Sequence, residues 1–175
     1  MNRKLKLDEL NRLTVDEYKD LKKYPIVVVL NNIRSLNNIG SFFRTCDAFA
    51  IQKLILTGIT ATPPHREIRK TALGATESVE WLYEKSCIKV VAEYKKLGFK
   101  TLAVEQTTNS INLQQFSYNG EPLLLIFGNE VDGVEQQVIE QCDHCIEIPQ
   151  FGTKHSFNVS VSGGIVLWHL IKQIA

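Results

Sequence analysis

Long hydrophobic runs are missing from this 175-residue sequence. No stretch approaches the roughly 18 to 20 apolar residues that a membrane-spanning helix needs. The N-terminal residues MNRKLKLDEL also lack the apolar core of a signal peptide. We therefore expect a cytoplasmic protein without a membrane partner.

Cysteine is scarce. The four cysteines, Cys46, Cys87, Cys142 and Cys145, are too few and too scattered for a disulfide framework, so we expect free thiols. Cys142 and Cys145 form a Cys-x-x-Cys pair, which leaves a metal or redox site as an alternative. A structural zinc needs four ligands and the sequence has no second pair, so we expect no metal.

A strong excess of either charge is also absent. Twenty Lys and Arg residues balance nineteen Asp and Glu residues, which leaves a formal net charge of +1. This excludes nucleic-acid binding by bulk electrostatics, so any such contact must come from local patches. One patch lies in the N-terminal segment and another comprises His65, Arg66, Arg69 and Lys70. Ordinary solvated surface is the alternative interpretation of both patches.

No internal repeat, low-complexity tract or Pro/Gly/Ser-rich linker divides the chain. Apolar runs at 26–30, 53–57, 101–105, 123–127 and 145–148 alternate with helical patterns at 38–49, 67–73, 86–97, 134–141 and 156–172. This alternation predicts one compact α/β domain over 25–175, with a mostly parallel sheet and helices on both faces. Residues 1–24 are expected to form a helical arm, with Thr14 as an N-cap between two short helices. Ligands of such sheets bind at the carboxyl ends of the strands.

The segment after the first predicted strand, LNNIRSLNNIGSFFRTCDAFA, combines asparagines and arginines with the start of an apolar helix. Asn38 is expected near the helix start, and Arg44 nearly two turns farther on. The structural alternative makes Asn38 a helix cap and Arg44 a surface cation.

The segment after the fourth predicted strand, LLLIFGNEVDGVEQQVIE, places glycines at both ends of a short loop. Gly128 would let a ligand approach the backbone closely, and Glu130 brings a carboxylate to the end of the strand. The glycine spacing matches neither a P-loop nor a dinucleotide fingerprint.

The last segment, IEIPQFGTKHSFNVSVSGGIVLWHL, gathers small polar residues where a long apolar helix begins. Ser156, Asn158, Ser160 and Ser162 could cap that helix, but they also supply donors and acceptors for a ligand. Gly163 and Gly164 destabilise a helix unless they permit close packing, so we expect a tight contact there.

Together, in this order, the three segments resemble the sequence motifs of the SpoU family of RNA methyltransferases, within the SPOUT class. The resemblance spans roughly residues 25 to 172 and includes the stretch KTALGATESVEW at 70–81. It rests on Asn38, Arg44, Gly128, Glu130, Gly133, Pro149, Ser156, Asn158 and Ser160. Phe157 stands where the family more often has leucine, and Trp168-His169 where it often has tyrosine and an acid.

The resemblance implies an α/β fold with a deep C-terminal trefoil knot, in which S-adenosylmethionine binds. By the same resemblance, the cofactor contacts would come from Gly128, Ile148, Phe157 and Glu105. It also implies a homodimer, with the terminal helix and the first-motif helix at the interface and an active site completed by both subunits. The activity implied is methylation of a ribose 2′-hydroxyl of tRNA or rRNA, by direct methyl transfer that requires no metal.

A ribose hydroxyl is a poor acid, so its methylation calls for a base or for charge stabilisation. The resemblance assigns this role to Arg44, either as a base or, because a guanidinium is normally always charged, as a cation that stabilises the developing alkoxide. Asn38, Glu130, Ser156 and Asn158 would orient the arginine, the ribose and the cofactor.

The short chain mildly favours tRNA as the substrate, with the N-terminal arm and Arg66, Arg69 and Lys70 as RNA contacts. The alternative is an RNA-binding or assembly factor that keeps the fold without methylating. That alternative predicts the loss of a polar motif residue, and every one of these residues is present.

Overall fold

A computed structural model describes residues 2–175, apart from the side chain of Leu7. The strands are β1 (Tyr24–Asn31), β2 (Ile51–Thr57), β3 (Trp81–Glu84), β4 (Lys100–Val104), β5 (Ile111–Asn112), β6 (Leu123–Phe127) and β7 (His144–Glu147). The helices are η1 (Leu7–Leu10), α1 (Val15–Asp20), α2 (Leu36–Ala48), α3 (Arg66–Ala72), α4 (Ala75–Ser78), α5 (Cys87–Lys96), η2 (Leu113–Gln115), α6 (Gln136–Ile139) and α7 (Val159–Ile171).

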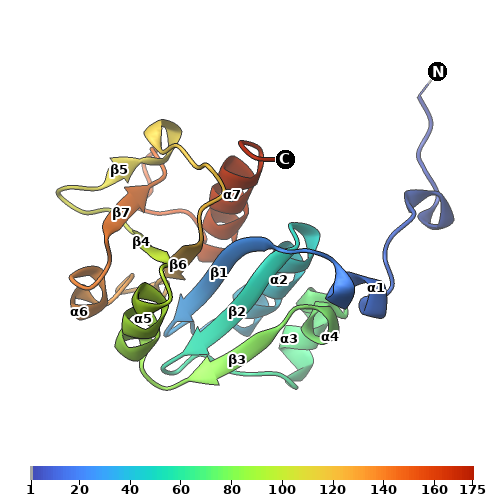
Figure 1. The fold of residues 1–175 in the computed structure, drawn as a ribbon, viewed down its shortest axis with the longest axis horizontal. Helices are drawn as coiled ribbons and strands as arrows, with labels where there is room; N and C mark the ends of the chain where they lie inside the picture. The colour runs from blue at the N-terminus through green and yellow to red at the C-terminus, as the bar shows by residue number, and fades with distance from the viewer. Residues whose placement is uncertain (1) are drawn as a thin grey trace.

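The strands form one sheet in the order β3-β2-β1-β6-β4-β7-β5, and every neighbouring pair is parallel (Figure 1). The central strands β1 and β6 are apolar on both faces because both faces are covered. Along β1, Val28 and Leu30 belong to one hydrophobic cluster, whereas Val27 and Val29 belong to the other. The predicted parallel α/β sheet is thereby confirmed.

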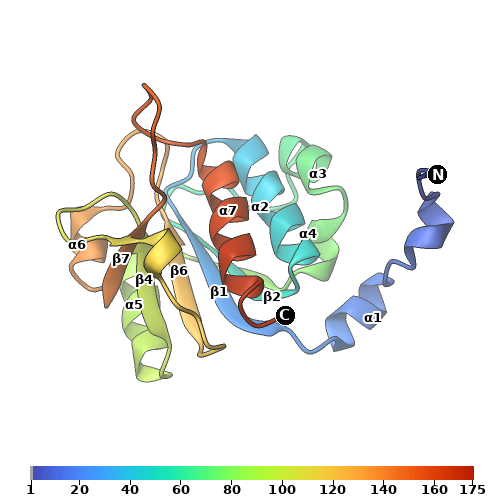
Figure 2. The same cartoon turned by 90° about the horizontal axis from the view of Figure 1, so that it is seen from above.

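The helices form a layer on each face of the sheet (Figures 1 and 2). Helices α2, α3, α4 and α7 contribute to the larger cluster, whereas α5 and α6 contribute to the smaller one. Helix α7 approaches α2 closely at Gly163, where an added Cβ would lie 2.4 Å from the Phe42 ring. The expected tight contact is therefore present at Gly163, but nothing lies within 4 Å of a Cβ at Gly164.

The C-terminal part of the sheet is threaded. Strand β7 lies between β4 and β5, although the chain has already joined those two strands through residues 105–110. The chain then leaves β7 and returns over the larger cluster as α7 (Figure 2). The segment after β7 thus passes through a region that earlier residues enclose, which is the arrangement expected for a knot.

Residues before β1 form the expected pair of short helices, of which η1 extends away from the body whereas α1 contacts α4 (Figures 1 and 2). Thr14 caps α1, and its hydroxyl accepts a hydrogen bond from the Glu17 N–H at 3.3 Å, as predicted. The arm is held at Tyr18, which is buried and donates a hydrogen bond to the Cys46 carbonyl.

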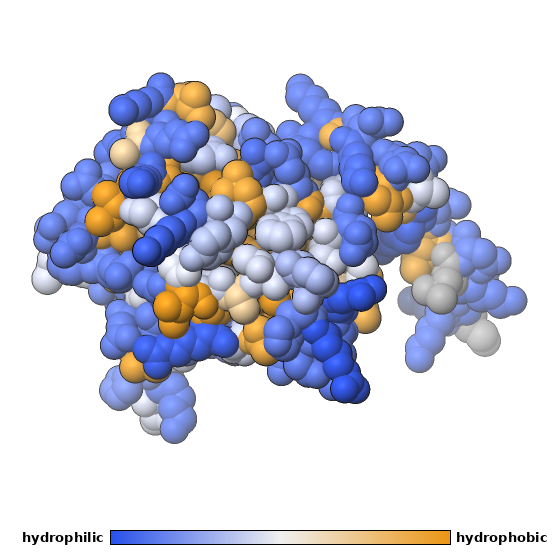
Figure 3. Space-filling model, turned by 90° about the horizontal axis from the view of Figure 1, so that it is seen from below, coloured by the Kyte–Doolittle hydropathy of each residue, from blue (hydrophilic) through white to orange (hydrophobic). Residues whose placement is uncertain are grey.

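Hydrophobic residues are dispersed on the surface, and the cysteines are unpaired. The face drawn in Figure 3 carries hydrophobic residues as separate patches among hydrophilic ones. In the described part of the chain, no helix is both long and apolar enough to cross a bilayer. All four cysteines are free, as expected.

Candidate active site at the carboxyl ends of the strands

A hydrogen-bonded network joins the three segments singled out in the sequence. The Asn38 amide donates to Glu130 Oε1 at 2.8 Å, and its carbonyl oxygen accepts from Asn158 Nδ2 at 3.1 Å. Ser160 Oγ lies 3.3 Å from the same Asn38 oxygen and 2.6 Å from Asn158 Oδ1. Asn38, Glu130, Asn158 and Ser160, here called the polar network, therefore come from α2, the loop after β6 and α7.

Local sequence determines how the two helices present these residues. Ser35, not Asn38, is the N-cap of α2, since Ser35 Oγ accepts from the Asn38 N–H at 3.3 Å. The capping alternative is therefore wrong for Asn38, which lies in the first turn with its side chain 7% exposed. For Asn158 the capping alternative is correct, because its Oδ1 accepts from the Ser160 and Val161 N–H groups. Asn158 caps α7 with its oxygen and contacts Asn38 with its nitrogen.

The loop that carries Glu130 depends on two glycines. An added Cβ at Gly128 would lie 2.0 Å from the Gly133 carbonyl carbon, because the loop folds back on itself there. Gly133 has a φ of 68°, a conformation that side chains disfavour. The absent side chain at Gly128 therefore allows the chain to approach itself, and contact with a cofactor at Gly128 stays a prediction.

The charge of Glu130 is stabilised where it lies. Partial burial raises the pKa of Glu130, but hydrogen bonds from Asn38 and from the backbone N–H groups of Arg34 and Ser35 outweigh it, so its pKa lies below the ordinary value. The Arg34 side chain reaches Asp132 Oδ2 at 3.6 Å, a second link between the same two loops. The network thus contains an ionised carboxylate at neutral pH.

Arg44 does not join the polar network within one chain. It is exposed, and among the described residues its side chain has no hydrogen bond or ion pair. Six helical residues separate it from Asn38, which places it about 9 Å along α2 and about 120° around it. Arg44 lines a groove of about 470 Å³ between the N-terminal arm and helices α2 and α4, together with Arg12 and Asp47. The surface-cation alternative describes Arg44 in the isolated chain.

The proposed cofactor contacts Ile148, Phe157 and Glu105 line one small cavity with Ser156. It has a volume of about 60 Å³ and lies between the ends of β4 and β7 and the segment before α7. Residues 151–158 of that segment are exposed and project from the body (Figure 2). Gly128 is not among the residues that line this cavity.

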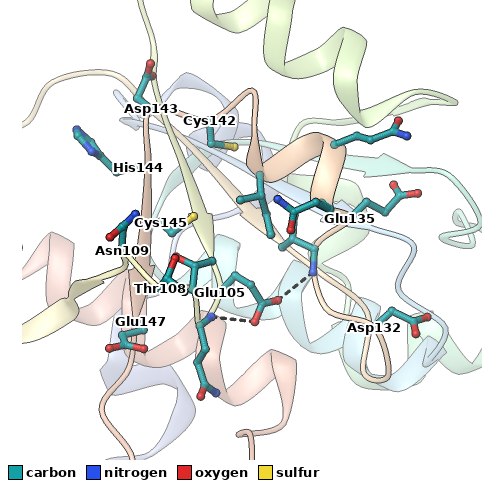
Figure 4. A pocket seen from close by; sticks show the side chains of 16 residues that line it. Glu105, Thr108, Asn109, Asp132, Glu135, Cys142, Asp143, His144, Cys145 and Glu147 are labelled. Carbon is teal, nitrogen blue, oxygen red and sulfur yellow. Dashed lines mark hydrogen bonds between the residues drawn. The ribbon is translucent and has the colours of Figure 1, made fainter.

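Glu105 also joins two loops. Its carboxylate accepts from the Val134 N–H at 3.0 Å and from the Gln106 N–H at 2.8 Å, as the dashed lines in Figure 4 show. Gln106, which the motifs did not indicate, donates from Nε2 to the His155 carbonyl at 2.8 Å. These contacts connect the end of β4 to the loop after β6 and to the segment before α7.

The Cys-x-x-Cys pair borders the wide depression drawn in Figure 4, which has a volume of about 1370 Å³ and carries several carboxylates. Burial, followed by the nearby Cys145, raises the pKa of the Cys142 thiol to about 12, so this thiol is protonated at neutral pH. In the described part of the chain, no group of three or more His, Cys, Asp or Glu side chains could hold a metal ion. The geometry gives the metal alternative no support.

The basic residues expected to contact RNA are exposed together on α3. Arg66, Arg69 and Lys70 lie at the surface, while Ile68 of the same helix is buried in the core. Their side chains have no hydrogen bond or ion pair with any described residue. They are free to bind an anionic partner.

Comparisons with known proteins agree on one family. The family model described as SpoU rRNA Methylase matches residues 25–168. The chain is 31% identical over 153 residues to the mouse tRNA (guanosine(18)-2′-O)-methyltransferase TARBP1, covering 85% of this chain but only 9% of the mouse protein.

Two solved structures share the fold. The TrmH/SpoU tRNA modifying enzyme of A. aeolicus has a TM-score of 0.80 and 26% identity, over 91% of this chain and 81% of that one. The AdoMet-bound rRNA methyltransferase of Sinorhizobium meliloti has a TM-score of 0.80 and 22% identity, over 90% of this chain and 60% of that one. Together with the threaded strand order, this likeness confirms the knotted α/β fold.

Proposed function

Because this chain belongs to the SpoU rRNA methylase family, we propose that it transfers a methyl group from S-adenosylmethionine to a ribose 2′-hydroxyl of tRNA or rRNA. The observation that carries the proposal is the polar network, which brings one residue or more from each of the three motifs into hydrogen-bond contact. A fold retained only for binding would not require these side chains to meet.

The methyl donor is S-adenosylmethionine, whose sulfonium supplies an activated methyl group when bound. The cavity lined by Ile148, Phe157, Glu105 and Ser156 combines apolar walls with polar groups, which suits a nucleoside attached to an amino acid. At about 60 Å³ it is too small for the whole cofactor. Because residues 151–157 are exposed, that segment can move outward on cofactor binding at little cost in buried surface, while Asn158 stays in the polar network.

The chain's own residues supply orientation and charge. The ionised Glu130 is an acceptor that can orient a ribose hydroxyl, and the Asn38 amide fixes the position of that carboxylate. Ser156 lines the cofactor cavity, and Asn158 belongs to the polar network. Arg44 would hold an RNA phosphate and stabilise the alkoxide that develops on the ribose.

Arg44 needs a second chain to reach such a site, because it does not contact the polar network of its own chain. We propose a homodimer in which the Arg44 of one subunit serves the network of the other. The outer face of α7 supports this, since Val161 is 50% exposed, Trp168 is 60% exposed and Gly164 has open space above it. Trp168 lies beside Phe49 at the end of α2, so the two helices offer one continuous apolar surface.

The RNA is a tRNA or an rRNA, with tRNA favoured. Its contacts outside the active site are the exposed cations on α3 and the N-terminal arm (residues 1–24), which precedes the methyltransferase domain (residues 25–175). The protein works in the cytoplasm, in keeping with its four free thiols.

The deciding experiment measures transfer of radiolabelled methyl from S-adenosylmethionine to total tRNA and, separately, to rRNA. We expect label on one of them, retained in a linkage that resists alkaline hydrolysis, since a 2′-O-methyl group blocks that cleavage. Arg44→Ala should abolish the label, whereas the matched control Lys96→Ala, which removes an exposed cation from α5, should keep it.

Cofactor binding without transfer to either RNA would contradict the proposed substrates. Failure to bind the cofactor at all would favour the alternative of an RNA-binding factor that keeps the fold without methylating.

A further inference from the structure

A small pocket lies under α3 and α4 at the β3 edge of the sheet, away from the polar network. It has a volume of about 290 Å³ and is lined by Pro63, Pro64, Arg69, Thr76, Glu77 and Trp81. This size is at the lower end of small-molecule pockets, which span about 300–1,000 Å³. The pocket therefore suits one flat heterocycle and not an extended ligand.

The apolar walls of the pocket are flat and fixed. Trp81 begins the edge strand β3, is half-buried and packs edge-on against the buried Phe43, with ring centroids 6.1 Å apart and planes at 86°. Pro63 and Pro64 line the same space. An indole held in place is a surface on which a nucleobase can stack without further ordering of the protein.

The polar groups of the pocket offer both a cation and an acceptor. Arg69 has no hydrogen bond or ion pair with any described residue, so its guanidinium is available. Glu77 is exposed and its Oε1 accepts a hydrogen bond from the Thr76 hydroxyl at 3.3 Å, which orients the carboxylate. Guanine matches this pair best, because it presents two adjacent N–H donors to a carboxylate and the O6 and N7 acceptors to an arginine.

We propose that this pocket binds an unpaired guanine of the RNA, distinct from the nucleotide that is methylated. The exposed Arg66 and Lys70 on the same helix as Arg69 supply a basic surface for the adjoining phosphates. The chain carries no large excess of positive charge, so a pocket that combines stacking with local cations gives it a specific hold on RNA. This inference rests on the proposed function in taking the base from the RNA substrate.

The test uses Trp81 as its own reporter. In a Trp168→Phe background, Trp81 is the sole tryptophan, and its fluorescence is followed during titration with the RNA trinucleotides UGU and UCU. We expect saturable quenching, with UGU binding at least about fivefold more tightly than UCU. Glu77→Gln should remove the preference for UGU, and Arg69→Ala should weaken binding of UGU about tenfold or more. The control Lys96→Ala should change neither the preference for UGU nor the affinity for UGU.

Absence of quenching by both trinucleotides, or unchanged quenching in Glu77→Gln and Arg69→Ala, would overturn the proposal. Methyl transfer, measured on wild type, Glu77→Gln and Arg69→Ala that all retain Trp168 of the proposed dimer surface, separates this result from the proposed function. Methyl transfer without quenching of Trp81 would support the proposed methyltransferase activity and contradict the guanine site. Quenching without methyl transfer would support the guanine site in a protein that binds RNA but does not methylate it.

Discussion

At the scale of single residues, Asn38 has the largest role because both ends of its amide are used. Its nitrogen donates to Glu130, and its oxygen accepts from Asn158 and Ser160. An ionised carboxylate can accept hydrogen bonds but cannot donate them. An aspartate here could therefore not donate to Glu130 and would place a like charge beside it. The position therefore requires an amide, which the sequence motif alone did not explain.

Replacing Asn38 with alanine should lower methyl transfer by about 10²-fold, because Glu130 and Asn158 would lose their common partner. It should also lower the free energy of unfolding by about 0.5–1.5 kcal/mol, since it removes the hydrogen bonds that Asn38 makes with the exposed side chains of Glu130 and Asn158. The neighbouring Asn37 is exposed, and Asn37→Ala is the matched control that should alter neither value. Urea denaturation and the methyl-transfer assay measure the two effects, and equal effects of the two variants would contradict this role.

The Glu130 carboxylate should make stability depend on pH at the acidic end. The pKa of Glu130 is depressed in the folded protein, so its contribution is present above the unfolded value of about 4.3 and is lost as pH falls through the lower folded value. Because the group is partly exposed, we expect a contribution of about 1 kcal/mol or less.

The measurement compares melting temperatures of wild type and Glu130→Gln from pH 7 to pH 3. Wild type should be the more stable protein at pH 7, and the difference should shrink in acid. A difference that stays constant with pH would show that the charge of Glu130 does not stabilise the fold.

At the scale of elements, α7 has two unlike sides. Gly163 faces the Phe42 ring in the core, whereas Gly164 faces open space one residue later. Both glycines look the same in the sequence, and the close approach predicted for the pair belongs to Gly163 alone. Only the crossing of α7 over α2 distinguishes them.

The two glycines therefore give a matched pair of variants. Gly163→Ala should destabilise the protein by about 1–3 kcal/mol, because the fully buried Phe42 must move. Gly164→Ala should leave stability unchanged or raise it by up to about 1 kcal/mol, since alanine favours the helix and meets nothing. Chemical denaturation of dilute protein would test this, and a more harmful Gly164→Ala would contradict the assignment of the two sides.

The main strands and helices were predictable because their signals are local. The continuous apolar runs of β1, β6 and α7 and the periodic apolar face of α2 can each be recognised within a single segment of sequence. The elements α4, β3 and β5 were missed. Helix α4 is a single turn, and neither β3 nor β5 contains a buried residue, so these two strands lack the buried apolar run that indicated the others. The position of Arg44 relative to the site was not predictable either, because it depends on how α2 turns and on which chain it serves.

At the scale of the whole molecule, the proposed active site belongs to two chains. This can be tested by mixing two inactive variants, Arg44→Ala and Asn158→Ala, after both have been unfolded and refolded together. Random pairing in a twofold dimer gives one intact site in each mixed dimer, so about a quarter of wild-type methyl transfer should return.

Mixing without unfolding, which leaves the original dimers intact, is the control and should restore nothing at first. If Arg44 instead acts within its own chain, every site in the mixture carries one defect, and no activity should return. Sedimentation of each variant alone establishes that both are dimers before they are mixed.

The threading of the C-terminal segment has a consequence for how the protein matures. Asn38 and Asn158 meet across 120 residues of sequence, and their contact requires the segment after β7 to have passed through the enclosed region first. Contacts so distant in sequence form late and slowly. A misthreaded molecule could bury most of its core and resemble the native protein by circular dichroism, yet it would have no Asn38–Asn158 contact. Recovery of methyl transfer after dilution from denaturant should therefore lag behind recovery of helix content, so that catalysis itself reports when the last threading step is complete.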